Sequence, residues 1–183
     1  MATTKYIVNN ASGQTINGES ILPAYKVYTA LLTQSGGEFQ EIAVPGSGLN
    51  VGVSYLIEEN SGYNFIPLGA PNNNIGTYFL CNQDIDTDTD ISFQLSYNLG
   101  APVVTVLENT IGNIWWTFVA DGEYYANSDN IFPSNKTFCQ NIIISSSPNY
   151  LLSFIVNDNY VDFICTDGNN NLNNTPIEIR VYN

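Results

Sequence analysis

The 183-residue chain contains no histidine and only four basic residues, against 17 acidic ones. Histidine is the usual general base, the partner of serine and cysteine nucleophiles, and the commonest transition-metal ligand. Its absence therefore excludes most hydrolase and zinc mechanisms. The sequence also lacks a GxGxxG motif, a phosphate-binding loop and a nucleophile elbow. These absences predict a protein that is not an enzyme and that needs no organic cofactor.

The four basic residues are Lys5, Lys26, Lys136 and Arg180, and the formal net charge is −13. Nucleic-acid binding requires a basic patch, which these residues cannot supply, so we exclude nucleic acid as a partner. The same charge disfavours anionic membrane surfaces. No apolar run approaches the roughly 18 residues of a membrane-spanning helix, so we expect no membrane partner. The acidic surface mainly favours solubility.

Cysteine is also scarce, because the chain has only Cys81, Cys139 and Cys165. They are odd in number, lie far apart without a CxxC motif, and each sits in an apolar run. This pattern predicts small buried side chains and disfavours disulfides or a thiolate metal site. The first 15 residues, MATTKYIVNNASGQT, lack the apolar segment of a signal peptide, so we expect folding in a cytoplasm.

Hydrophobic residues make up 44% of the chain and aromatic residues 13%, enough for a sizeable core. The apolar runs are short and are separated by Gly, Asn, Asp and Pro turns, with no convincing helix among them. This pattern predicts an all-β fold, an antiparallel β-sandwich or jelly roll of about a dozen short strands.

The clearest fold signal is the stretch 103–138, which holds both tryptophans. Residues 103–107 and 114–119 are apolar runs rich in β-branched and aromatic side chains, which predicts two strands. Asp121 and Gly122 follow, and such a pair tolerates the positive φ that a tight hairpin needs. We therefore expect a hairpin turn here.

One further hairpin is predicted at the first long apolar run, and a further strand lies later in the chain. Residues 24–34 favour a strand over a helix because Tyr, Val and Thr dominate their first half. The Ser-Gly-Gly sequence at 35–37 then predicts a turn into a paired strand at 38–44. Residues 91–97 alternate cleanly between apolar and polar side chains, so one face of that strand should be buried.

Three strands are predicted at residues 139–145, 151–156 and 160–166. Their connections have hairpin length, which favours an antiparallel meander. At the level of domains, we expect residues 1–22 to form an N-terminal arm or edge hairpin. Residues 23–183 then form the β-sandwich domain.

The two tryptophans point to opposite faces of one predicted strand. Strand alternation places Trp116 with Ile114 and Phe118, and places Trp115 with Thr117 and Val119. At least one indole should therefore lie in the core, while the other could cover a sugar ring or meet a partner. The candidate contact residues are Trp115, Trp116 and Tyr124. Catalysis by neighbouring carboxylates is the least favoured alternative.

One cluster of metal-ligand residues is present, the alternating Asp84, Asp86, Asp88 and Asp90. Its spacing is typical of the start of a calcium loop, and calcium is the only cofactor that the sequence suggests. The rest of that motif is missing, because Thr89 occupies the glycine position and Leu95 the final glutamate position. The alternative, which we favour, is a solvated hairpin tip between strands 77–81 and 91–97.

Several phrases of the sequence carry a family resemblance. They are KYIVNNASGQTING, YTALLTQSGG, YNFIPLGAPNNNIGTYF, PVVTVLENTIGNIWWTF and TPIEIRVYN. Together they resemble phrases that recur in small β-rich structural proteins of tailed bacteriophages, a group that includes capsid-decoration, head-fibre and tail-fibre components. Residues 37–98 separate two phrases that are neighbours in such proteins, which suggests an inserted hairpin-rich subdomain.

The resemblance implies a non-enzymatic virion protein that attaches to a capsid or tail surface. Its expected partners are other virion proteins and further copies of itself, since viral assemblies are symmetric. Its expected location is the virion, after folding in the host cytoplasm. The alternative is a carbohydrate-binding adhesion module that contacts host surface glycans through Trp115 or Trp116.

Overall fold

The computed structural model describes residues 14–16, 19–21, 24–34, 39–84, 92–141, 151–165 and 172–183. They form antiparallel β-sheets, which confirms the predicted all-β fold class. Apart from the single turn η1 (Ile66–Leu68), this described part contains no helix, and so none that could cross a membrane. The strands are β1 (Gln14–Ile16), β2 (Glu19–Ile21), β3 (Tyr25–Thr33), β4 (Gln40–Ala43), β5 (Ser54–Asn60), β6 (Tyr78–Leu80), β7 (Phe93–Asn98), β8 (Val103–Asn109), β9 (Trp115–Ala120), β10 (Glu123–Asn127), β11 (Thr137–Asn141), β12 (Leu151–Asn157), β13 (Tyr160–Cys165) and β14 (Thr175–Tyr182).

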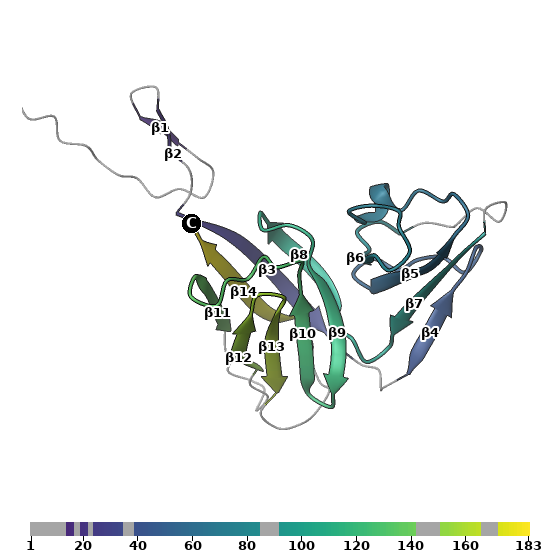
Figure 1. Ribbon diagram of the computed structural model, residues 1–183. Helices are drawn as coiled ribbons and strands as arrows, with labels where there is room; N and C mark the ends of the chain where they lie inside the picture. The colour runs from purple at the N-terminus through teal and green to yellow at the C-terminus, as the bar shows by residue number, and fades with distance from the viewer. Residues whose placement is uncertain are drawn as a thin grey trace, which may run out of the picture.

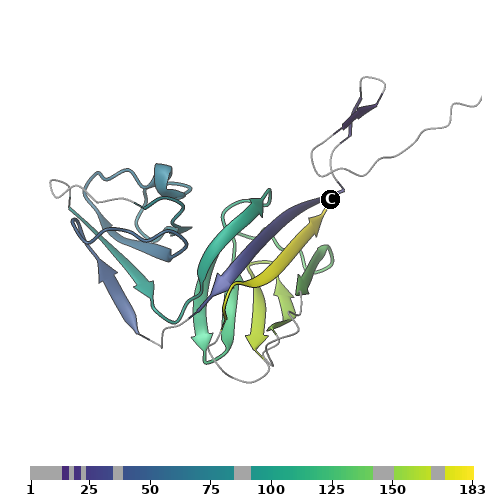
Figure 2. The ribbon, with the colours of Figure 1, turned by 180° about the vertical axis from the view of Figure 1, so that it is seen from behind.

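Two four-stranded sheets pack face to face as a β-sandwich (Figures 1 and 2). One sheet has the strand order β11-β14-β3-β8 and the other has the order β12-β13-β10-β9. Side chains from both sheets meet in one core. Its large rings include Tyr28 of β3, Trp116 of β9, Tyr124 of β10 and Phe163 of β13, all fully buried. Aromatic side chains therefore fill the space between the sheets.

Strand alternation explains which residues enter this core. In β14, from Ile177 to Tyr182, the inward positions are isoleucine or valine and the outward positions are polar or aromatic, as the period-two pattern predicts. In β3 every second residue from Tyr28 to Leu32 is fully buried, and the segment is a strand, as predicted, rather than a helix. The inward residues are Ile177, Ile179 and Val181 of β14, and Tyr28, Ala30 and Leu32 of β3.

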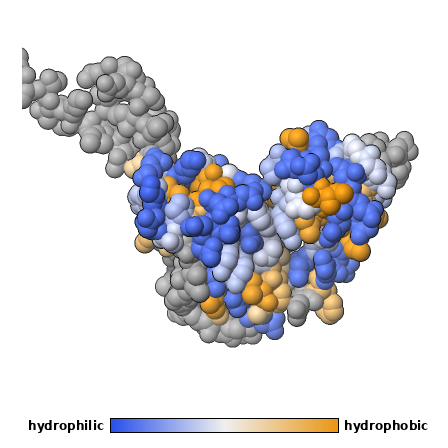
Figure 3. Space-filling view, in the orientation of Figure 1, coloured by the Kyte–Doolittle hydropathy of each residue, from blue (hydrophilic) through white to orange (hydrophobic). Residues whose placement is uncertain are grey.

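A second, smaller module has its own sheet, with the order β4-β7-β5-β6, and its own hydrophobic core. Rings of Tyr55, Phe65, Phe79 and Phe93 dominate that core. The chain enters this module after β3 and returns to the sandwich at β8, and β3 and β8 are hydrogen-bonded neighbours. The module thus lies between two paired strands, inside the range 37–98 where an inserted subdomain is expected. Figure 3 shows a mainly hydrophilic surface on both modules.

The turn between β9 and β10 lies at Asp121 and Gly122, as predicted. Gly122 has a φ of 77°, whereas Asp121 stays outside the positive-φ region. The pairing register shifts directly after the turn, between Glu123 and Tyr124. A left-handed glycine followed by an irregular register is typical of a hairpin that closes with a bulge.

The predicted hairpin between 24–34 and 38–44 is wrong. Strand β3 lies between β14 and β8, so both of its edges are already occupied. Strand β4 instead pairs with β7, residue Ala43 opposite Leu95. A Ser-Gly-Gly sequence permits a tight turn but does not determine which strand pairs with the next one. Here β4 pairs with β7 because Ala43 and Leu95 are both buried in the separate core of the second module.

The predicted three-strand meander is only partly correct. Strands β12 and β13 form the expected antiparallel hairpin. Strand β11 pairs with β14 in the opposite sheet, with Phe138 opposite Arg180. Strands β11 and β12 therefore belong to opposite sheets of the sandwich, so a short sequence separation was not sufficient evidence for their pairing.

None of the three cysteines is in a disulfide, and two of them are buried as predicted. Cys81 is buried in the second module and Cys165 in the sandwich core. Cys139 is half-buried and packs against the sandwich core.

Candidate functional site

The two tryptophans of β9 lie on opposite faces of the strand, which confirms the prediction from period-two alternation. Trp116 is 1% exposed, and its indole Nε1 donates a hydrogen bond to the Tyr28 hydroxyl at 3.2 Å. Burial raises the pKa of Tyr28 well above its ordinary value, so this hydroxyl stays neutral. Trp115 faces outward and is half-buried. Trp115 is therefore the indole that a partner can reach.

For two of the three candidate contact residues, the predicted contact with a ligand or partner is wrong. Trp116 and Tyr124 are 1% and 0% exposed, so neither can present a ring to a ligand at the surface. Both belong to the inward set of their strands, where packing between the sheets buries them. Of the three, Trp115 alone has an accessible side chain.

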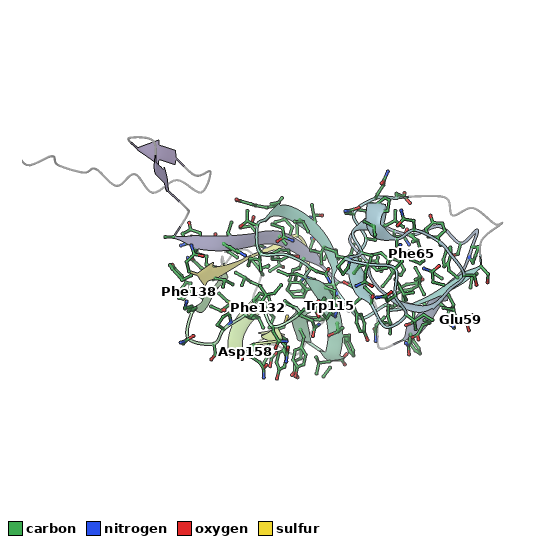
Figure 4. The ribbon with its side chains drawn as sticks, turned by 45° about the horizontal axis from the view of Figure 1, so that its top comes forward. Glu59, Phe65, Trp115, Phe132, Phe138 and Asp158 are labelled. Atoms are coloured by element: carbon green, nitrogen blue, oxygen red, sulfur yellow. The ribbon has the colours of Figure 1, made fainter. Side chains whose placement is uncertain are left out.

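The outward face of Trp115 meets the second module. Tyr78 of β6 stacks on Trp115 with ring centroids 5.5 Å apart and an interplanar angle of 8°. The Asn113 side-chain amide donates a hydrogen bond to the Tyr78 carbonyl at 3.1 Å. Figure 4 shows Trp115 on the side of the sandwich that is next to the second module. The aromatic pair therefore spans the boundary between the two modules.

A hollow of about 180 Å³ opens beside this pair. We call it the seam site. Apart from the two stacked rings, its lining is mostly polar and uncharged, with one carboxylate. The lining comprises Pro71, Asn72, Gly76, Thr77, Tyr78, Asn113, Trp115 and Asp129.

Hydrogen bonds hold the amides of the seam site in place. The Asn72 side-chain oxygen accepts from the Thr77 hydroxyl at 2.6 Å and from the Asn74 backbone at 2.9 Å. Asn113 uses its amide nitrogen on the Tyr78 carbonyl. These bonds orient the Asn72 nitrogen and the Asn113 oxygen as polar groups beside the exposed rings. Flat rings next to fixed amides are suited to a ligand with an apolar face and hydroxyl groups at its edge.

The two modules are also joined in the interior. The Ser54 hydroxyl of β5 accepts a hydrogen bond from the Trp116 backbone N–H at 2.8 Å, and this contact is buried. The backbone N–H of Val104 donates to the Gly52 carbonyl at 2.9 Å. Strand β6 pairs with β5, whose Ser54 is bonded to β9, and this arrangement places Tyr78 against Trp115.

Asp162 of β13 is a buried carboxylate outside the seam site. It is 4% exposed, and its Oδ1 has no hydrogen-bond partner within the described residues. Burial raises the pKa of this carboxyl, and the nearby Glu123 carboxylate raises it further. At neutral pH the folded chain thus holds a charge that is poorly compensated.

Replacing Asp162 with asparagine is therefore expected to raise the melting temperature at neutral pH, because the buried charge is removed. The pKa is higher in the folded than in the unfolded state, so wild-type stability increases as the pH falls through the folded pKa. The advantage of Asp162→Asn should accordingly shrink in acid. Thermal melting across a pH series measures this. The exposed Asp158→Asn makes the same charge change and should have little effect; equal gains for both variants would contradict the prediction.

The acidic run is only partly covered by the structure. Asp84 is exposed and follows β6, whereas Asp86, Asp88 and Asp90 lie outside the described residues. Among the described residues, no group of three or more Cys, Asp or Glu side chains could hold a metal ion. The calcium site stays a prediction.

Tyr78 and Asn72 were not identified from the sequence. Tyr78 lies in a three-residue strand of the second module, far from Trp115 along the chain. No local pattern marks a residue whose role depends on the packing of one module against another. Searches against protein-family models, curated proteins and solved structures returned no significant match for this chain.

Proposed function

We propose that this chain is a non-enzymatic structural protein of a tailed-phage virion. In this proposal it attaches to the capsid or tail surface as a decoration, head-fibre or tail accessory component, and it self-associates. The observation that carries the proposal is the β1–β2 hairpin, whose strands pair with each other and with no other described strand. In Figure 1 the hairpin stands apart from the sandwich.

An isolated two-stranded hairpin is marginally stable in water, because it has no second layer against which to pack. Its unpaired edges also offer backbone N–H and C=O groups to a neighbouring sheet. Both properties favour an attachment arm that is completed by another virion protein. The phage-like phrases and the lack of histidine support the same assignment.

Deleting residues 1–22 is expected to leave a folded chain that no longer associates with particles. The sandwich starts at β3, so its core retains every strand after the deletion. Particles purified by gradient sedimentation would be tested for the chain, and thermal melting would check its fold. The full-length chain, produced in the same way, is the control. Undiminished co-purification of the shortened chain would overturn the attachment role, and light scattering of a monomer at high concentration would overturn self-association.

A second candidate function is adhesion to host glycans. The half-exposed Trp115, stacked on Tyr78 beside fixed amides, favours it. An indole can cover the apolar face of a sugar ring, while amides and a carboxylate bind its hydroxyl groups. Adhesion and attachment are compatible, because the seam site and the β1–β2 hairpin involve different strands.

A further inference from the structure

We propose that the glycan ligand is an uncharged linear polysaccharide, bound along a strip that runs from the seam site across β9, β10 and β13. This inference rests on the second candidate function and deepens it. We call this strip the aromatic face. Its members are Tyr78, Trp115, Asn127, Tyr125 and Tyr160.

Strand register brings these residues together. Trp115 lies opposite Asn127, and Asn127 lies opposite Tyr160, so the three form one row across three strands. Tyr125 lies two residues from Asn127 and therefore on the same face. Its ring stacks on that of Tyr160, with centroids 4.2 Å apart and an interplanar angle of 11°. The row thus has a stacked aromatic pair at each end.

The centre of the row is held rigid. The Asn127 side-chain amide donates to the Thr117 hydroxyl at 2.9 Å and to the Tyr125 carbonyl at 3.1 Å. It is therefore committed to the protein and fixes the floor between the two aromatic pairs. A preorganised floor reduces the entropy lost when a long ligand is ordered on it.

The spacing requires a ligand of several sugar units. Neighbouring strands lie about 4.8 Å apart, so Trp115 on β9 and Tyr160 on β13 are separated by about 10 Å. A single sugar ring cannot reach both, whereas a chain of sugars can cover one aromatic pair with one ring and the other pair with another. Beyond Trp115 the seam site provides room for a further unit.

The charge of the face selects uncharged polymers. Strands β9, β10 and β13 contain no lysine or arginine. Glu123 and Asp162 lie on the same side of the sheet as Tyr125, and Asp129 lines the seam site. An anionic polysaccharide would be repelled by these carboxylates and by the net charge of −13. A neutral chain would meet hydroxyl-binding groups without this penalty.

Isothermal titration of the full chain with β-linked glucose and N-acetylglucosamine oligomers, from monomer to hexamer, tests the proposal. Affinity should increase roughly 10-fold or more between the shortest binding oligomer and the longest. Trp115→Ala should abolish binding. Tyr160→Ala should keep binding of short oligomers but lose the increase with length. Tyr182→Ala is the control, since it removes an exposed tyrosine from the other sheet and should change nothing.

The outcomes separate the two levels of the hypothesis. Binding that requires Trp115 but does not depend on length or on Tyr160 would overturn the extended face and leave glycan adhesion at the seam site intact. No binding of any oligomer would overturn both. Equal binding of polygalacturonate would contradict the charge argument. A concentration-dependent dimer that Tyr160→Ala abolishes would assign this face to a second copy of the chain.

Discussion

Replacing Trp116 with alanine is expected to lower stability by roughly 3–5 kcal/mol, because it leaves a large cavity between the two sheets. For a chain of this size the loss corresponds to a decrease of about 10 °C in melting temperature. The variant also removes the donor to the Tyr28 hydroxyl, a buried group that then has one partner fewer. Trp116 packs against Phe163 at 5.3 Å, so the cavity would open in the middle of the core.

The neighbouring Trp115→Ala is the matched control. It deletes the same side chain from the same strand, but from the outward face. Its effect on the melting temperature should be small by comparison, since only the stacking with Tyr78 is lost. Chemical and thermal unfolding, followed by circular dichroism, would measure both variants. Similar losses for Trp115→Ala and Trp116→Ala would show that the assignment of faces in β9 is incorrect.

Replacing Gly52 with alanine is expected to disrupt the junction between the two modules. Gly52 has a φ of +83°, and an added Cβ would lie 2.4 Å from the Val104 carbonyl oxygen and 2.9 Å from the Val104 nitrogen. These are backbone atoms of β8, which cannot move without breaking the pairing with β3. We expect overpacking to cost roughly 1–3 kcal/mol, in addition to the unfavourable φ.

Gly76→Ala separates the cost of steric overlap from the cost of the left-handed backbone conformation. Gly76 has almost the same φ, +84°, but an added Cβ would have nothing within 4 Å. It should therefore lose only the roughly 1–2 kcal/mol of the left-handed conformation. Thermal melting would compare the variants, and limited proteolysis would detect a loosened junction in Gly52→Ala alone. The close-approach argument would fail if both glycines responded equally.

The sequence was sufficient to predict the fold class and the faces of its strands. Period-two alternation correctly places Trp115 and Trp116 on opposite faces of one strand and Ile177 and Ile179 inward, because burial of one strand face is a local property of the pattern. The Asp121-Gly122 turn was also predictable, since the positive φ that it needs is a local requirement, met at Gly122.

Strand partners and the seam site could not be predicted in this way. An alternating strand reports that one face is buried, but not which strand lies at its edge, so β4 and β11 were assigned to the wrong neighbours. The pairing of Tyr78 with Trp115 depends on how the second module packs on the sandwich. Such packing combines residues that are distant along the chain, and no local pattern encodes it.

The position of the second module between β3 and β8 has a consequence for the folding route. Thr33 pairs with Val103, although residues 34–102 separate them along the chain. Joining two such distant segments carries the loop-closure entropy of a long flexible chain, and high contact order slows folding. Once the second module has folded around its own core, its two ends are already close together, because Gln40 in β4 pairs with Asn98 in β7. The folded module then holds the ends of β3 and β8 near each other and shortens the search by which this edge pair of the sheet forms.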